Sequence, residues 1–411
     1  MDMAANGALL PGFVNAHSHA FHRALRGRSH IGQMGAESFW GWRDDMYHLA
    51  ETVDKDLYIF YALCTQTFRE MKRTGVTTVG EFHYLHHCDA EKRDYALDEV
   101  ILTAAKDANI RIVLLLTYYN QAGVDGQKQL SAAQRRFVSD DQRSFWENFD
   151  RIETLTDSNM QTLGVAGHSI RAVDTENLIR LRNEAESRGV PFHMHLEEQP
   201  QEIFDCEQWL GKSPSAFVLN ELRPNERFAA VHCSYTKESE LRALLETGAN
   251  VCICPLTEGY LGDGIPPLPE WQSNQVDKFG YPNLSLGSDS NTRICMIEEM
   301  RWLIYGQQLR QNRRGHSSFG GQRQSAHDLF RIATAGGARS LGLANHCAAI
   351  KRGRKADFIL VDLNSNELRD DLATFETNRQ SVNLLDALVF GASSAECITA
   401  TAVNGVMDNF K

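Results

Sequence analysis

Two histidines stand one residue apart near the start of the sequence, directly after an apolar run. His17 and His19 follow the run at residues 9–15 within GALLPGFVNAHSHAFHRALRGR. On an extended segment this spacing places both imidazoles on one face, where they can bind a divalent metal ion together. Two histidines at this spacing, taken alone, are also common as structural residues or as surface residues. Its meaning therefore depends on what the other strand ends carry.

Three later segments carry further histidines and a carboxylate after apolar runs. His195 lies in HMHLEE, His232 ends AAVH, and Asp289 lies in GSDS. Taken singly, His232 is typical of a hydrogen-bonded core histidine, and Asp289 of a turn or helix N-cap. Their order on successive strand ends is harder to explain by packing and favours a metal site.

Neutral imidazoles and one carboxylate suit a divalent ion that keeps one position open for water. Such an ion lowers the pKa of its water to about 7. Glu198 lies three residues after His195, just past the predicted strand. At this position Glu198 can shuttle protons without being a metal ligand. Taken alone, Glu197 and Glu198 are also typical of a solvent-exposed helix start.

Apolar runs alternate with longer segments of helical period, which predicts an α/β fold with a parallel sheet. Eight such units favour a (β/α)8 TIM-type barrel, whose chemistry sits at the carboxyl ends of its strands. No GxGxxG follows the first run, which disfavours a dinucleotide-binding fold. The predicted strands are residues 9–15, 77–82, 110–117, 161–167, 191–195, 228–232, 250–254 and 284–287, and the clearest predicted helices are 54–74, 175–188, 237–247 and 297–313.

The chain changes character after about Asn345. Residues 355–362 and 397–403 are predicted strands joined by a polar stretch. We therefore expect a hydrolase barrel over residues 8–346 and a small, incomplete β-sandwich domain from residues 1–7 and 347–411.

Composition excludes several classes of protein. The net charge of −11 argues against nucleic acid or an anionic membrane as the main partner. No apolar stretch approaches the roughly 18 residues of a membrane-spanning helix, and the start lacks the features of a signal peptide. The nine cysteines are scattered, which predicts reduced core thiols in a cytoplasmic protein.

The ordered set PGFVNAHSHAF, HMHLEE, AAVHCS and GSDS resembles the mononuclear aminohydrolase branch of the amidohydrolase superfamily. This resemblance implies one divalent ion, Zn²⁺ foremost, with Fe²⁺ and Mn²⁺ left open. It also implies that Glu198 is the proton shuttle, that His232 polarises the surroundings of the attacked carbon and that Asp289 assists at the metal. The implied metal ligands are His17, His19, His195 and Asp289.

A narrower resemblance joins SFWGWRDDMYHLA, GEFHYLHH, GHSIRAV, HMHLEEQPQEI and LTEGYLGDGIPP to the N-formimidoyl-L-glutamate iminohydrolases of histidine degradation. It implies hydrolysis of the formimidoyl C=N of a small dicarboxylate to N-formyl-L-glutamate and ammonia, by a homodimer. Planar guanidinium groups suit such carboxylates. The implied substrate residues are His22, Arg43, Tyr84, His168 and Arg171, with His22 standing where these enzymes have glutamine.

Two alternatives stay open. Another aminohydrolase of the branch, acting on a purine, pterin or triazine ring, would share the metal set and Glu198. A pair of cations at Arg43 and Arg171 argues against a neutral heterocycle. A catalytically impaired homologue is the second alternative, and the intact ligand set counts against it.

Members of this family have some tens of residues before the HxH strand, whereas sixteen precede His17 here. We therefore expect the start to be truncated or misassigned, or a second subunit to cover the tail. On that view the tail strands lack partners and expose sheet edges.

Overall fold

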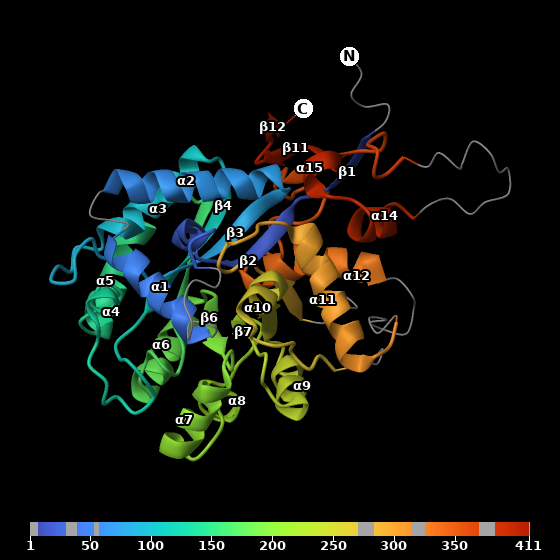
Figure 1. Cartoon of the computed structure of the whole chain (residues 1–411). Coiled ribbons are helices and arrows are strands. Elements are labelled where there is room, and N and C mark those ends of the chain that lie inside the picture. Colours follow the sequence, from blue (N-terminus) through green and yellow to red (C-terminus); the bar gives the residue numbers. More distant parts are fainter. Residues whose placement is uncertain are drawn as a thin grey trace.

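Eight parallel strands form one sheet that curls into a barrel, with helices on its outside (Figure 1). The computed structural model describes residues 7–29, 39–52, 57–269, 283–314, 325–369 and 383–410. Neighbouring strands in the sheet are also neighbours in the sequence, from β2 to β9. This order is that of a TIM-type barrel and confirms the predicted fold class.

The barrel strands lie close to their predicted places. Strands β2, β3 and β4 are buried at every position, as expected for strands covered on both faces. The strands are β2 (Phe13–Ser18), β3 (Val76–His83), β4 (Arg111–Tyr118), β5 (Gln161–Gly167), β6 (Phe192–Leu196), β7 (Phe228–His232), β8 (Asn250–Ile253) and β9 (Leu284–Leu286).

The helices also follow the sequence signals. Helix α6 spans the predicted 175–188 because Asp174 caps its first turn and Gly189 adopts a positive φ of 70° at its end. No helix among the described residues is long and apolar enough to cross a membrane. The helices are α1 (Phe39–Thr52), α2 (Leu57–Arg73), α3 (Ala96–Asp107), α4 (Ala132–Arg135), α5 (Gln142–Glu153), α6 (Thr175–Arg188), α7 (Pro200–Leu210), α8 (Pro214–Phe217), α9 (Glu238–Glu246), α10 (Pro255–Leu261), α11 (Met296–Gln311), α12 (Ser325–Arg331), α13 (Gly337–Ser340), α14 (Leu384–Phe390) and α15 (Ser394–Cys397), with short helical turns η1 (Ala20–Leu25), η2 (Val218–Leu222) and η3 (Ile332–Gly336).

The first and last barrel strands meet where both end. Ser18 forms an isolated parallel bridge with Asp289. The amide of His19 donates to the Asp289 carbonyl over 2.9 Å, and the amide of Asp289 donates to the His17 carbonyl over 3.0 Å. These bonds bring the two ends of the sheet together at the carboxyl side of the strands.

The apolar run predicted as one strand at 9–15 is divided between two sheets, so that prediction was wrong in its bounds. Strand β1 (Gly7–Pro11) pairs antiparallel with β10 (Phe358–Asp362), and β2 begins at Phe13. Gly12 lies at the junction, where an added Cβ would come within 2.1 Å of the Thr77 side chain. Glycine therefore allows the chain to pass closely between the two sheets.

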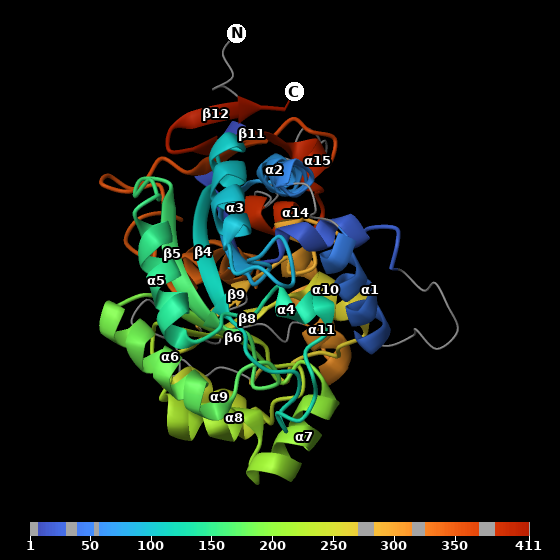
Figure 2. The ribbon, with the colours of Figure 1, turned by 90° about the vertical axis from the view of Figure 1, so that its left-hand side faces the viewer.

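The tail strands have partners, contrary to expectation. The small sheet has the order β1, β10, β11 (Ile398–Val403) and β12 (Val406–Asn409), and lies at one end of the molecule (Figure 2). Among the described residues it is a single antiparallel sheet and not a sandwich. Residues 8–11, which the prediction gave to the barrel, belong to this sheet, and residues 1–6 lie outside the described ranges.

A buried ion pair joins the small sheet to the barrel. Arg111, at the start of β4, contacts Asp357 through Nε at 2.9 Å and Nη2 at 3.0 Å. Asp357 is 2% exposed and also accepts from the amide of Asn404. This bidentate pair, with the amide of Asn404 as a third donor to the carboxylate, sets the relative placement of the two sheets.

We expect Asp357→Ala to destabilise the fold by about 3–5 kcal/mol, because it leaves a guanidinium buried without its partner. The measurement is the shift of the denaturant unfolding midpoint. Glu147→Ala is the control, since the Arg143–Glu147 pair lies in solvent and contributes little to stability. Equal shifts for the two variants would contradict this role for Asp357.

Candidate active site

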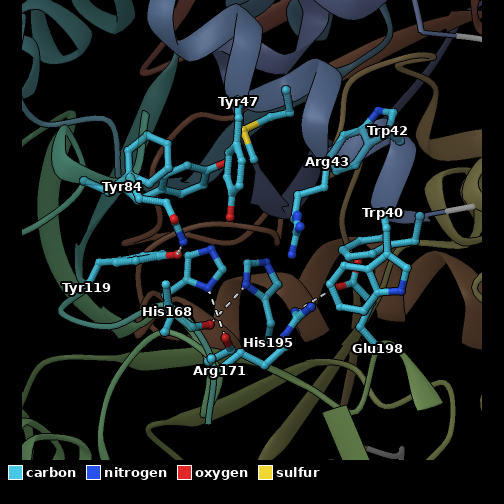
Figure 3. A pocket seen from close by; sticks show the side chains of 18 of the residues that line it. Trp40, Trp42, Arg43, Tyr47, Tyr84, Tyr119, His168, Arg171, His195 and Glu198 are labelled. Carbon is cyan, nitrogen blue, oxygen red and sulfur yellow. Dashed lines mark hydrogen bonds and ion pairs between the residues drawn. The ribbon is translucent and has the colours of Figure 1, made fainter. Parts of the chain in front are cut away.

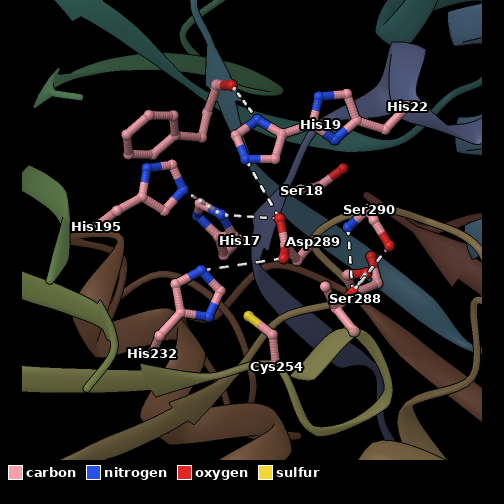
Figure 4. Close-up of polar contacts among 12 residues, drawn as sticks. His17, Ser18, His19, His22, His195, His232, Cys254, Ser288, Asp289 and Ser290 are labelled. Carbon is pink, nitrogen blue, oxygen red and sulfur yellow. Dashed lines mark hydrogen bonds and ion pairs between the residues drawn. The ribbon is translucent and has the colours of Figure 1, made fainter. Parts of the chain in front are cut away.

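Four side chains predicted as metal ligands converge at the carboxyl ends of β2, β6 and β9 (Figure 4). The Nε2 atoms of His17 and His19 lie 3.4 and 3.3 Å from Oδ1 of Asp289. The Nε2 of His195 lies 3.2 Å from that of His17. All four residues are buried, and the first and last of them, His17 and Asp289, lie 272 positions apart in the sequence (289 − 17).

Hydrogen bonds to main-chain carbonyls direct the free nitrogens inward. The Nδ1 of His19 contacts the Phe82 carbonyl at 2.8 Å, and the Nδ1 of His195 contacts the His168 carbonyl at 3.1 Å. A carbonyl only accepts, so each Nδ1 carries the proton and each Nε2 keeps its lone pair. Both lone pairs face the cluster.

Burial keeps these imidazoles uncharged. It lowers the pKa of His19 to about 3, helped by the neighbouring His17. Burial, followed by neighbouring imidazoles, also lowers the pKa of His17 and of His195 well below the usual value. Neutral imidazole is the form that binds metal ions.

The spacing fits a small divalent ion. Four ligand atoms placed tetrahedrally at about 2.0–2.1 Å from a zinc ion lie about 3.3 Å from each other. The observed separations of 3.2, 3.3 and 3.4 Å match this value. Three nitrogens and one carboxylate oxygen are also a donor set that zinc accepts. The cluster can therefore hold one metal ion.

Asp289 is held in place by the seam of the barrel. Its φ of 47° lies in the left-handed region, which costs energy for a residue with a Cβ. Neighbouring Ser288 donates from its amide to Asn15 over 2.9 Å, fastening GSDS to β2. Gly287 permits the close approach, since a Cβ there would lie 2.7 Å from the Cβ of His17.

Glu198 lies beside the metal ligands, and Arg171 holds it. The Nη2 of Arg171 donates to Oε2 of Glu198 over 3.0 Å. On its other side the Nε of Arg171 lies 2.7 Å from Oε2 of Glu202, which is fully buried. Arg171 thus has two carboxylate partners, Glu198 through a hydrogen bond and Glu202 through an ion pair.

His232 ends β7 among three carboxylates. Its Nε2 lies 3.6 Å from Oε1 of Glu198 and 4.0 Å from Oδ2 of Asp289, and its Nδ1 lies 3.3 Å from Oε1 of Glu258. Burial acts to lower the pKa of His232, but these three carboxylates outweigh it and raise the pKa to about 10. Among the described residues no hydrogen-bond partner reaches its Nε2.

A cavity of about 220 Å³ opens above the metal ligands (Figure 3). All predicted site residues line it except His17 and His232, which lie deeper. Arg43 and Tyr47 reach into it from α1. The Arg43 guanidinium lies 4.6 Å from the Trp40 ring and 5.2 Å from the Tyr47 ring, and its ion-pair partner among the described residues is the exposed Asp44.

His22 and Tyr84 form a pair at the cavity wall. The Nε2 of His22 lies 2.6 Å from the Tyr84 hydroxyl, while its Nδ1 is buried with no partner among the described residues. The ring of His168 packs edge-on against Tyr84 and Tyr119. Aromatic faces and a few polar atoms thus form the wall.

Sequence reasoning missed several residues of the site. Tyr47 and Tyr119 line the cavity, and Glu202 and Glu258 hold Arg171 and His232. Tyr119 follows β4 directly, so its place after a strand end was a usable signal. The two glutamates lie one turn into helices that follow strands, where nothing in the local pattern marks them.

A second histidine cluster lies outside the cavity. His83 and His86 lie 3.0 and 2.8 Å from Oδ1 of Asp98. The other nitrogen of His86 donates to the Thr117 carbonyl, and Asn148 donates to the other Asp98 oxygen. These bonds fasten α3 to β3 and β4.

A barrel of this topology, with imidazoles and a carboxylate at its strand ends beside a cavity, is typical of metal-dependent hydrolases. The amidohydrolase family matches residues 8–407, nearly the whole chain. The chain belongs to the amidohydrolase family and is a hydrolase of C–N bonds.

Three relatives illustrate the similarity. Formimidoylglutamate deiminase of Pseudomonas aeruginosa is 34% identical over 87% of this chain and 77% of its own length. The crystal structure of an amidohydrolase from Brucella melitensis has a TM-score of 0.83 at 30% identity, covering 97% of this chain and 84% of that one. An adenosine deaminase from Xanthomonas campestris with bound zinc shares the fold, with a TM-score of 0.76 at 23% identity and coverages of 98% and 80%.

We expect His19→Ala to bind far less metal than the unchanged protein, because it removes one of four ligands. Metal content is measured by plasma mass spectrometry after dialysis. His22→Gln is the matched control, since His22 lies beside His19 yet outside the four-ligand cluster, and it should retain the metal. Full occupancy in His19→Ala would remove His19 from the ligand set.

Proposed function

We propose that the protein hydrolyses the formimidoyl C=N of N-formimidoyl-L-glutamate, giving N-formyl-L-glutamate and ammonia. The observation that carries this proposal is Arg43, a cation inside the cavity that lies against aromatic rings and has an exposed ion-pair partner. A dicarboxylate requires such a group, whereas a neutral ring does not. The similarity to formimidoylglutamate deiminase supports the same substrate.

Glu198 is the proposed proton carrier. His17, His19, His195 and Asp289 would hold a divalent ion, for which Zn²⁺ suits the ligands best; when bound, it would supply Lewis-acid chemistry and lower the pKa of a water at the site to about 7. Glu198 takes the water proton on Oε1, since Arg171 holds Oε2. The same carboxyl then delivers that proton to the imino nitrogen. It next relays the second water proton, released from the hydroxyl as the C=O forms, to the same nitrogen, which leaves as ammonia while the water oxygen stays on carbon.

Arg43 and Arg171 are the proposed carboxylate-binding groups. Arg43 reaches the cavity from α1, and Lys128 adds a positive charge to the lining. Arg171 binds Glu198 and Glu202 already, so only its remaining N–H donors are available to substrate. Arg43 is therefore the better probe of carboxylate recognition, because its replacement does not release Glu198.

Ammonia release from N-formimidoyl-L-glutamate, compared with guanine and adenosine, tests the proposal. We expect release from the formimidoyl compound alone. A faster release from either purine would instead favour the other deaminases of the family, whose rings could stack on the same aromatic wall.

The variant Arg43→Met tests in the same assay whether Arg43 binds the substrate carboxylate. Loss of a charge-assisted hydrogen bond should raise KM about 10-fold or more and change kcat less. An unchanged KM would remove Arg43 from the substrate site.

We expect Glu198→Gln to keep its metal and lose at least ~10²-fold in kcat, the scale of a missing general acid–base group. Glutamine can still accept from Arg171, so the pocket keeps its shape. Turnover and metal content are measured on the same preparation. Full activity would exclude Glu198 as the proton carrier.

A cytoplasmic location and a homodimer also remain proposals. All nine cysteines are thiols that form no disulfide, which supports a reducing compartment. The homodimer follows only from the family resemblance.

A further inference from the structure

Glu258 is a buried carboxylate behind His232 that the proposed chemistry does not use. It lies in α10, which follows β8 directly, and is 3% exposed. Its Oε1 accepts from the amide of Cys254 over 2.9 Å and lies 3.3 Å from Nδ1 of His232. Oε1 thus ties His232 to the chain just past β8.

His232 needs such a support because its backbone is unusual. Its φ of 76° lies in the left-handed region, and that of Cys233 is also positive, at 56°. A residue with a Cβ occupies this region at a cost, so the surroundings must hold it there. The amide of Cys233 donates to the Leu196 carbonyl, which holds the main chain, while Glu258 contacts the ring.

The two ring nitrogens of His232 face different surroundings. Nδ1 faces Oε1 of Glu258, an oxygen that also accepts from the amide of Cys254, so this nitrogen is placed as the donor. Nε2 faces Glu198 and Asp289 across 3.6 and 4.0 Å. Of the three carboxylates around His232, Glu258 is the one that neither lines the cavity nor belongs to the metal-ligand cluster.

We propose that Glu258 is a positioning residue: it holds the Nδ1–H of His232 and thereby directs Nε2 into the space between Glu198 and Asp289. This inference rests on the proposed function, in which the water and the departing nitrogen occupy that space. The arrangement is that of an imidazole whose orientation and proton position are set by a carboxylate behind it.

The variant Glu258→Gln separates this role from simple packing. Its amide oxygen can still accept from Cys254 and His232, so the fold is kept while the charge is lost. We expect kcat to fall 10- to 100-fold, the range for partners that orient catalytic groups, with KM and metal content unchanged. Glu299→Gln is the matched control, since Glu299 is equally buried and accepts from the amide of Leu256. It should change kcat by less than about 3-fold.

A double-mutant cycle with His232→Asn decides whether Glu258 acts through His232. If it does, adding Glu258→Gln to His232→Asn lowers kcat by no further than about 2-fold. Full additivity of the two losses, or metal loss in Glu258→Gln, would overturn the proposal. The cycle is run on whichever substrate releases ammonia.

Nitrogen-15 NMR of the histidine rings gives a readout that needs no turnover. The signal that disappears in His232→Asn should show a protonated Nδ1, and Glu258→Gln should change the proton distribution of that ring. An unprotonated Nδ1 in the unchanged protein would overturn the positioning role. Failure of the ammonia assay would reject the proposed function while leaving this test intact.

Discussion

The site depends on the seam where the first barrel strand meets the last. His17, His19 and Asp289 sit on the two sides of this seam, and main-chain hydrogen bonds between them fix their separation. Gly287 allows the strands to approach, and the Asn15–Ser288 bond fixes their register. Without closure these ligands would lie at opposite edges of an open sheet.

Closure also explains why the imidazoles are ready to bind a metal. The barrel mouth buries them, and burial lowers their pKa values so that they are neutral. Main-chain carbonyls at the ends of neighbouring strands then fix which nitrogen is free. Because the strands end together, the fold sets the position, the charge state and the tautomer of the metal-binding imidazoles.

The charged side chains around the cavity fall into two groups, those proposed to act in catalysis and those proposed to bind the substrate. Glu198 and His232 are each held from behind, by Arg171 and by Glu258. Arg171 is therefore part of the support of Glu198 as well as part of the cavity wall. Arg43 does not support a catalytic side chain in this way: within the part of the chain that the structure describes, it contacts the rings of Trp40 and Tyr47 and the exposed Asp44.

The sequence by itself determined the fold class, most barrel strands and the metal cluster. Strand periodicity and the placement of His17, His195 and Asp289 after apolar runs are local properties, and parallel topology makes strand ends coincide. Only the tertiary structure decided how the first apolar run is divided and which side chains support the site. Residues 9–15 serve two sheets because β10 offers a partner that lies over 340 residues away. The second partner of Arg171 and the support of His232 likewise arise from side chains one helical turn past their strands, whose meeting no local pattern encodes.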